Sequence, residues 1–318
     1  MRTCAVNKVG RTGDGAAVAS GPTSCAARFT PLAALAISAS LKAGAAILDV
    51  YRSDFAVEHK DDKSPLTLAD RRSHEVIASA LKETGLPILS EEGRDIPYEE
   101  RRHWEYFWLV DPLDGTKEFI KRNGEFTVNI ALIHKTRPVM GVVYVPVKDV
   151  LYFGGEGLGA YKQTNARKTS DVRREPFTEP VGLNAVIPAC PESFCDTLLK
   201  SSRKLPLLKE SDRPYTVIAS RSHMSKETEE YLDKLRAEHG EVEIISAGSS
   251  LKFCLVAEGL ADEYPRFGPT MEWDTAAGQA VVEGAGGDVV AVPHQYHLAY
   301  NKPDLHNPWF MVRLEAAR

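Results

Sequence analysis

One stretch of the sequence constrains the fold more than any other, because an apolar run ends abruptly in a pair of acids. The run Tyr106–Val110 reads Tyr-Phe-Trp-Leu-Val, and it is followed directly by Asp111-Pro112-Leu113-Asp114-Gly115-Thr116. A short continuous apolar run of this kind predicts a strand that is covered on both faces. We therefore expect a layered molecule in which a buried strand leads into a turn that carries two carboxylates.

The order of the predicted elements divides the chain into two lobes. Helices are predicted at Pro31–Tyr51, with Pro31 in the first turn, and at Asp70–Glu83. Successive strands between residues 125 and 161 are typical of an antiparallel meander, whereas short strands alternate with helices from residue 216 onward. At 318 residues the chain also exceeds the usual size of one core. The predicted organisation is an α+β protein with a flexible tail over 1–29, an N-terminal α+β lobe over 30–180 and a C-terminal α/β lobe over 181–318.

Composition and charge exclude several classes of protein. A hydrophobic fraction of 43% with 26% charged residues excludes wholesale disorder, a collagen-like chain and a multi-span membrane protein. The 39 basic and 44 acidic residues give a net charge of −5, which argues against a nucleic-acid polymer as partner. The same net charge still permits an anionic small molecule, because a few cations or a bound metal can make one cleft positive.

Two further features concern the cellular compartment. The segment Pro31–Tyr51 approaches membrane-spanning length, but its serines, Lys42 and Asp49 favour a buried helix over an integral membrane segment. Five scattered cysteines without a metal-binding spacing are typical of a reduced, intracellular protein. We therefore expect a cytoplasmic protein.

Acids placed at the ends of elements predict a magnesium site. The turn after Val110 can present two carboxylates and the Leu113 carbonyl to one point, and such hard oxygen ligands suit Mg²⁺ with phosphate oxygens. Glu91 ends another predicted strand and Asp274 begins a later helix, so each can reach the same cleft. Taken alone, Asp274 predicts a helix cap. The six-residue turn is therefore the specific signal.

Three segments of the sequence resemble signatures of the inositol monophosphatase superfamily: the turn 111–116, the pair Glu91-Glu92, and Trp-Asp-Thr-Ala-Ala-Gly at 273–278. The run 108–133 further resembles the CysQ branch, the 3′(2′),5′-bisphosphate nucleotidases. The resemblance covers about residues 31–313 and implies a layered αβαβα sandwich with the active site between two lobes. The implied reaction is hydrolysis of the 3′-phosphate of 3′-phosphoadenosine 5′-phosphate, by water that Mg²⁺ activates, to AMP and phosphate in sulfate assimilation and nucleotide recycling.

The resemblance also implies roles for individual residues. Two or three Mg²⁺ ions are expected at Glu91, Asp111, the Leu113 carbonyl, Asp114 and Asp274. Thr116 is expected to assist the attacking water with Glu91 or Asp70 as proton acceptor, although a helix-capping role explains Asp70 equally well. Arg266 is assigned to the 5′-phosphate, against the alternative of a solvated surface cation. The implied substrate contacts are Leu113, Asp114, Gly115, Thr116, Ser220, His223, Ser249, Lys252, Arg266 and Asp274.

Two alternatives to the nucleotidase stay open at this point. The chain can be an inositol monophosphatase or another sugar phosphatase of the same superfamily, which a substrate comparison would reveal. It can also be a non-catalytic protein that binds a phosphonucleotide, although the complete set of acids disfavours this. A monomer and a homodimer are equally compatible with the sequence. Some CysQ proteins are peripheral on the cytoplasmic side of the inner membrane, but this chain shows no anchor.

Overall fold

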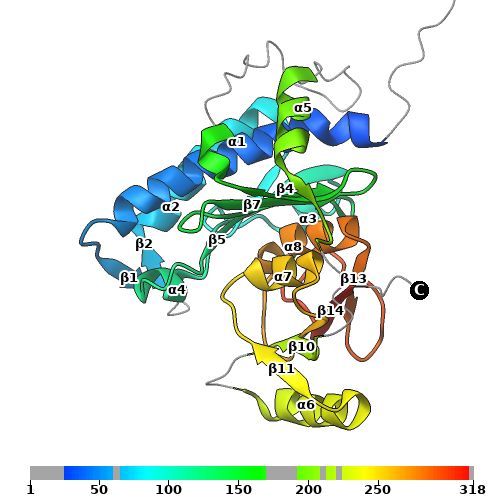
Figure 1. Cartoon of the computed structure of the whole chain (residues 1–318). Coiled ribbons are helices and arrows are strands. Elements are labelled where there is room, and N and C mark those ends of the chain that lie inside the picture. The colour runs from blue at the N-terminus through cyan, green and yellow to red at the C-terminus, as the bar shows by residue number, and fades with distance from the viewer. Residues whose placement is uncertain (1–24, 60–64, 170–191, 208–212, 220–223, 315–318) are drawn as a thin grey trace, which may run out of the picture.

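The computed structural model describes residues 25–59, 65–169, 192–207, 213–219 and 224–314, and these form five layers (Figure 1). Helices α1 (Cys25–Tyr51) and α2 (Leu68–Leu81) cover the outer face of a seven-stranded sheet. Helices α7 (Leu251–Glu258) and α8 (Glu272–Gly284) lie between this sheet and a five-stranded one, and α6 (Lys226–His239) lies beyond the second sheet. The arrangement is an α+β sandwich of the αβαβα type, so the predicted fold is confirmed.

The seven-stranded sheet contains the expected meander. Its strand order is β3-β4-β5-β6-β7-β8-β9, and every neighbouring pair is antiparallel except β3 and β4. Because helices cover both faces, the central strands β4, β5 and β6 are buried along most of their length, as Phe107 and Trp108 illustrate with no exposed surface. The strands span Ile88–Ser90, Tyr106–Asp114, Thr127–His134, Arg137–Val145, Val150–Gly155, Gly159–Thr164 and Arg203–Lys204, in chain order.

The five-stranded sheet is mixed, with the order β11-β10-β12-β14-β13. Strand β10 pairs in parallel with β11 and β12, which fits the predicted alternation of strands and helices in this part of the chain. Strand β14 pairs antiparallel with β12 and β13. The bounds are Tyr215–Ile218 for β10, Val242–Ile245 for β11, Glu263–Arg266 for β12, Gly287–Ala291 for β13 and Phe310–Leu314 for β14.

The remaining elements are short. Strands β1 and β2 form a separate two-stranded sheet. Strand β9 pairs with β8 in the first sheet although it follows residue 181. The sheets therefore divide the chain after Lys204, and the expected lobe boundary at residue 180 lies outside the described residues. These elements are β1 (Val57–His59), β2 (Pro65–Thr67), α3 (Tyr98–Arg101), α4 (Thr116–Ile120), α5 (Glu192–Ser201) and the 3₁₀ turns Lys82–Thr84 and Ala166–Thr169.

Helix α1 is a core element that begins earlier than the sequence predicts. It starts at Cys25, so Pro31 lies inside the helix rather than in its first turn. The proline removes one backbone hydrogen bond, and this local cost does not stop the helix. The segment Pro31–Tyr51 is long and apolar enough to span a membrane, but 78% of its most apolar window is buried in this structure. Its leucines and alanines pack against the first sheet, so α1 serves as a buried helix of the core.

Helix α8 packs unusually close to the meander, and this fixes where its first turn lies. A β-carbon at Gly141 of β6 would overlap the Ala277 carbonyl of α8. A β-carbon at Gly278 of α8 would likewise meet the Phe253 ring of α7, 2.5 Å away. Glycine at both positions lets the backbones approach. The first turn of α8, which carries Asp274, is therefore held next to the first sheet.

Candidate active site

The register between β3 and β4 brings two of the predicted acids together. The strands are parallel, with Ser90 opposite Val110, and the Glu91 amide donates to the Val110 carbonyl at 3.1 Å. Parallel strands end at the same edge of a sheet, so Glu91 and Asp111 follow side by side. Asp111 is only 1% exposed.

The sequence predicts that strand β4 ends in a turn after Val110. In the structure the strand instead continues to Asp114 and contains a bulge. Asp111 pairs with Asn129 and Asp114 pairs with Thr127, so three steps along β4 match two along β5. Without the extra residue, side chains three apart would point to opposite faces; the bulge puts both carboxylates on one face. The Leu113 amide donates to Asp111 Oδ1 at 3.1 Å and closes the bulge. This is how the strand end presents two acids at once.

Asp70 serves two purposes with its two carboxylate oxygens. Its Oδ2 accepts from the Thr67 amide at 2.8 Å and from the Thr67 hydroxyl at 2.6 Å, which completes the capping box of α2. Its Oδ1 accepts from the Thr116 hydroxyl at 3.2 Å. Burial raises the pKa of Asp70. The capping explanation and the pairing with Thr116 therefore both hold for this residue.

Asp274 reaches the site from the second lobe. It lies in the first turn of α8, where its Oδ2 accepts from the Met271 amide at 2.8 Å, so the expected capping contact is present. Burial, followed by repulsion from Asp114, raises the pKa of Asp274 to about 7. Burial raises the pKa of Asp111 well above its usual range, with further repulsion from Glu91, Asp114 and Asp274. Four carboxylates therefore repel one another across one site: two come from β4, one from α8 and one from the loop after β3.

This arrangement fits a divalent cation. The donors are all oxygens, which Mg²⁺ prefers, and the mutual repulsion of buried carboxylates is what a bound cation would relieve. In the described part of the chain, no three His, Cys, Asp or Glu side chains already stand together in ligand geometry. One oxygen each of Asp114 and Asp274 is instead directed to neighbouring donors. The donor chemistry thus agrees with the predicted magnesium ligands, and their coordination of a metal stays a prediction.

Direct hydrogen bonds join Asp114 to the second lobe. The Ser249 hydroxyl donates to the Asp114 carbonyl at 2.8 Å, and the Ser250 amide donates to Asp114 Oδ2 at 2.6 Å. Gly115 between Asp114 and α4 has φ +92°, and a β-carbon there would overlap the Ser249 hydroxyl. Glycine is required at this position for both reasons. Ser249, predicted as a substrate contact, therefore has its hydroxyl engaged in joining the lobes.

A cleft of about 230 Å³ lies where these segments meet. Asp114, Gly115 and Asp274 line it together with Lys252 and Arg266 from the second lobe. The Lys252 ammonium donates to the Ser249 carbonyl at 3.1 Å and lies over the Tyr264 ring. The structure therefore brings Lys252 and Arg266 next to the predicted metal ligands. The other two predicted nucleotide contacts, Ser220 and His223, lie outside the described residues.

Three buried polar residues of the site are missing from the sequence prediction: Thr127, Asn129 and Ser250. Each is at most 1% exposed, and each contacts Asp114. Thr127 and Asn129 are alternate polar residues in an otherwise apolar strand, which is a signal that could have been used. Ser250 carries no such signal, because serine before a helix ordinarily predicts a cap.

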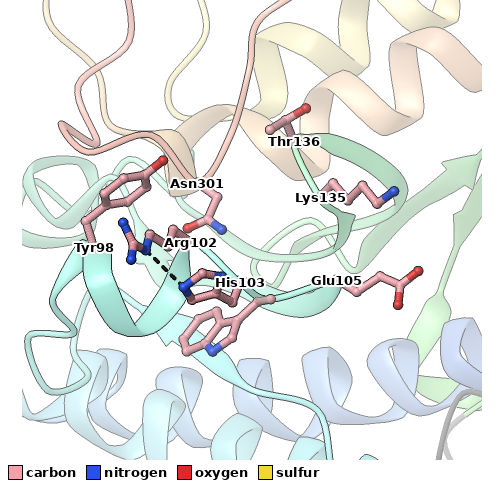
Figure 2. Close-up of a pocket in the computed structure, with 8 residues that line it drawn as sticks. Tyr98, Arg102, His103, Glu105, Lys135, Thr136 and Asn301 are labelled. Atoms are coloured by element: carbon pink, nitrogen blue, oxygen red, sulfur yellow. Dashed lines mark hydrogen bonds between the residues drawn. The ribbon is translucent and has the colours of Figure 1, made fainter.

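A larger hollow, of about 490 Å³, lies at the other end of β4. Figure 2 shows Arg102 directed toward His103, to which it donates a hydrogen bond of 3.0 Å, while Glu105 points away from both. Lys135 and Thr136 come from the turn between β5 and β6. Its lining contains one carboxylate, that of Glu105, against the several that meet near Asp114. Size alone therefore does not identify the reactive site in this molecule.

Comparison with known proteins decides the family. The profile described as the inositol monophosphatase family matches residues 29–311. The chain belongs to this family. A curated relative from Salmonella typhimurium, named 3′(2′),5′-bisphosphate nucleotidase CysQ, is 46% identical over 252 residues, which cover 78% of this chain and 85% of that protein. A CysQ of the same name from Haemophilus influenzae is 30% identical over 275 residues, covering 85% of this chain and 88% of the relative.

Solved structures of family members agree with the fold. The crystal structure of CysQ from Bacteroides thetaiotaomicron, described as a bacterial member of the inositol monophosphatase family, is 49% identical with a TM-score of 0.75. The match covers 91% of this chain and 98% of that one. The suhB protein of Bartonella henselae, at 22% identity and a TM-score of 0.61, shares the fold. Enzymes of this family are generally Mg²⁺-dependent, in agreement with the oxygen donors described above.

Proposed function

We propose that the chain is a Mg²⁺-dependent 3′(2′),5′-bisphosphate nucleotidase that releases the 3′-phosphate of 3′-phosphoadenosine 5′-phosphate. The observation that carries the proposal is the 46% identity to CysQ nucleotidases over 252 residues. The cleft supports it independently, because acids for a metal and two cations for an anionic substrate line the same small space. The products are AMP and inorganic phosphate, so the enzyme serves sulfate assimilation and nucleotide recycling.

The proposed cofactor is two or three Mg²⁺ ions. They would be held by Glu91, Asp111, the Leu113 carbonyl, Asp114 and Asp274. When bound, Mg²⁺ lowers the pKa of water and neutralises phosphate oxygens. The protein contributes the positions of these oxygens, which the parallel register, the bulge and the first turn of α8 determine.

Thr116 and Asp70 are proposed to handle the proton of the attacking water. The Thr116 hydroxyl donates to Asp70 Oδ1, which leaves the lone pairs of the hydroxyl oxygen free to accept a hydrogen bond from water. The proton of the water can then pass through Thr116 to Asp70, whose pKa is already raised by burial. The hydrogen bond favours Asp70 over Glu91 as the acceptor.

Arg266 is proposed to bind the 5′-phosphate, which is not cleaved. Its Nε is buried and has no hydrogen-bond partner among the described residues, while one terminal nitrogen donates to the Pro269 carbonyl at 3.1 Å. A buried guanidinium nitrogen without a partner is costly, and a phosphate oxygen would satisfy it. Lys252 lines the same cleft and adds a second positive charge.

The Arg266→Gln variant tests this assignment. A lost hydrogen bond to a charged group is expected to raise KM for 3′-phosphoadenosine 5′-phosphate about 10-fold or more. The KM for adenosine 3′-monophosphate, which lacks the 5′-phosphate, should change little. Steady-state kinetics on both substrates measures the difference, with Arg236→Gln on the exposed face of α6 as the control. Equal increases in KM for the two substrates would show that Arg266 does not bind the 5′-phosphate.

A substrate comparison in Mg²⁺ tests the proposed function itself. We expect 3′-phosphoadenosine 5′-phosphate to be hydrolysed with a higher kcat/KM than inositol 1-phosphate and fructose 1,6-bisphosphate. Phosphate release measures all three rates. Preference for either sugar substrate would refute the nucleotidase and leave a sugar phosphatase of the same family. Nucleotide binding without turnover would favour a binding protein.

The proposal includes the setting of the reaction. The substrate is a free small nucleotide rather than a nucleic-acid polymer, and the enzyme is cytoplasmic. Cys254 is a fully buried free thiol, which is compatible with a reduced compartment. The proposal is compatible with a monomer or a homodimer.

A further inference from the structure

One oxygen of Asp114 is surrounded by donors from both lobes. Asp114 Oδ2 accepts from the Ser250 amide at 2.6 Å and is 2.8 Å from the Ser250 hydroxyl. Asn129 Nδ2 donates to the same oxygen at 3.2 Å, and Thr127 Oγ1 lies 3.4 Å away. All three donor residues are buried. We call Thr127, Asn129 and Ser250 the Asp114 clamp.

The Ser250 hydroxyl links the two lobes within this clamp. It accepts from Asn129 Nδ2 at 2.9 Å and lies 2.7 Å from the Asp274 carbonyl. A hydroxyl carries a single hydrogen, and the Ser250 amide already binds Asp114, so that hydrogen is available to the Asp274 carbonyl. Ser250 thus contacts both predicted metal ligands that face each other across the lobes, through a carboxylate on one side and a backbone carbonyl on the other.

The clamp leaves the two oxygens of Asp114 in different surroundings. Oδ2 is committed to several donors, whereas Oδ1 has no hydrogen-bond partner among the described residues. A carboxylate held in this way cannot rotate freely, because rotation would leave the buried Ser250 amide without a partner and would take one acceptor from Asn129 Nδ2. Asp114 Oδ1 therefore stays available to a ligand in the cleft.

We infer that Ser250, supported by Asn129, is a positioning residue that orients Asp114 toward the cation and sets its spacing from Asp274. The inference rests on the proposed Mg²⁺-dependent function of this site. Ser250 need not touch the cation or the substrate; it acts through the two acids that it contacts. Partners that orient metal ligands in this way commonly change metal affinity 10- to 100-fold when they are removed.

The Ser250→Ala variant removes the hydroxyl and keeps the amide. Calorimetric titration of the metal-free full-length protein with Mg²⁺ should show an affinity at least about 10-fold weaker than in the wild type. The rise in Tm on adding Mg²⁺ should shrink at a fixed concentration. In kinetics, half-activation should need correspondingly more Mg²⁺, while KM for the nucleotide at saturating Mg²⁺ should stay within twofold.

Ser40→Ala is the matched control. Ser40 is also fully buried, and its hydroxyl donates to a backbone carbonyl, that of Ile37 at 2.9 Å, but it lies within α1 on the far side of the first sheet. A merely structural hydroxyl should lower Tm without changing Mg²⁺ affinity. If Ser250→Ala does not fold, the same titration on Asn129→Ala decides, with the same loss of affinity expected.

The outcomes separate the inference from the function. Wild-type turnover with Mg²⁺ affinity in Ser250→Ala within twofold of wild type would overturn the positioning role and leave the nucleotidase intact. Mg²⁺ binding by a wild-type protein that hydrolyses no nucleotide would refute the proposed function while the affinity of the variant still tests the clamp. A wild-type protein that binds no Mg²⁺ would refute both.

Discussion

Replacing Asp114 with asparagine is expected to lower kcat about a thousandfold or more while the protein stays folded. The change removes one carboxylate from the proposed cation site, and a loss of this size corresponds to about 4 kcal/mol of transition-state stabilisation. The amide side chain keeps the volume of Asp114 and an oxygen that can accept from the Ser250 amide. It also removes one of the charges that raise the pKa of Asp111, so repulsion in the metal-free protein falls.

Phosphate release and thermal unfolding, each in EDTA and in Mg²⁺, measure both parts of this result. The metal-free variant should unfold at a temperature no lower than the wild type, and Mg²⁺ should raise its Tm less. Asp149→Asn is the control, because Asp149 lies on the β6–β7 turn at φ +52°, which asparagine tolerates. A near-normal rate for Asp114→Asn would show that Asp114 is not a ligand of the cation.

Replacing Thr116 with valine is expected to lower kcat about a hundredfold or more. Valine keeps the branched shape but removes the hydroxyl that donates to Asp70 Oδ1, so the proposed path for the proton of water is lost. Thr116→Ser keeps the hydroxyl and should retain most of the activity. Because Thr116 binds no cation through its side chain in this proposal, Mg²⁺ affinity and KM should change little in both variants.

Kinetics over a range of Mg²⁺ concentrations distinguishes this role from a structural one. A valine variant as fast as the wild type would exclude the hydroxyl from proton transfer. A valine variant whose activity is rescued by excess Mg²⁺ would instead place Thr116 among the residues that position the cation. Thr116→Ser keeps the hydroxyl and removes only the methyl group, so a loss of activity in this variant comes from packing.

Local sequence signals were sufficient for much of the fold. The apolar run 106–110 predicted a doubly covered strand, and the turn signals between residues 134 and 159 predicted the meander that the structure contains. These succeed because strand burial and turn chemistry depend on neighbouring residues. The start of α1 was wrong by six residues, because a proline strongly suggests a first turn yet can also lie further into a helix.

The candidate site depends on contacts that local sequence patterns do not predict. The turn 111–116 identified Asp111 and Asp114, but not the bulge that puts them on one face, since a bulge depends on the register with β5. Ser250 and Asn129 were missed because they are 121 residues apart and meet only after the two lobes pack together. A serine before a helix looks the same in sequence whether it caps that helix or holds a carboxylate of another lobe.

Analysis of the reaction products is the most direct test of the central claim. The purified full-length protein is incubated with 3′-phosphoadenosine 5′-phosphate, with Mg²⁺ or with EDTA, and the nucleotide and phosphate are quantified by chromatography. The account predicts adenosine 5′-monophosphate and phosphate in equal amounts, formed in Mg²⁺ and not in EDTA. Release of the 5′-phosphate to give adenosine 3′-monophosphate, the same rate in EDTA, or no hydrolysis in Mg²⁺ would contradict it.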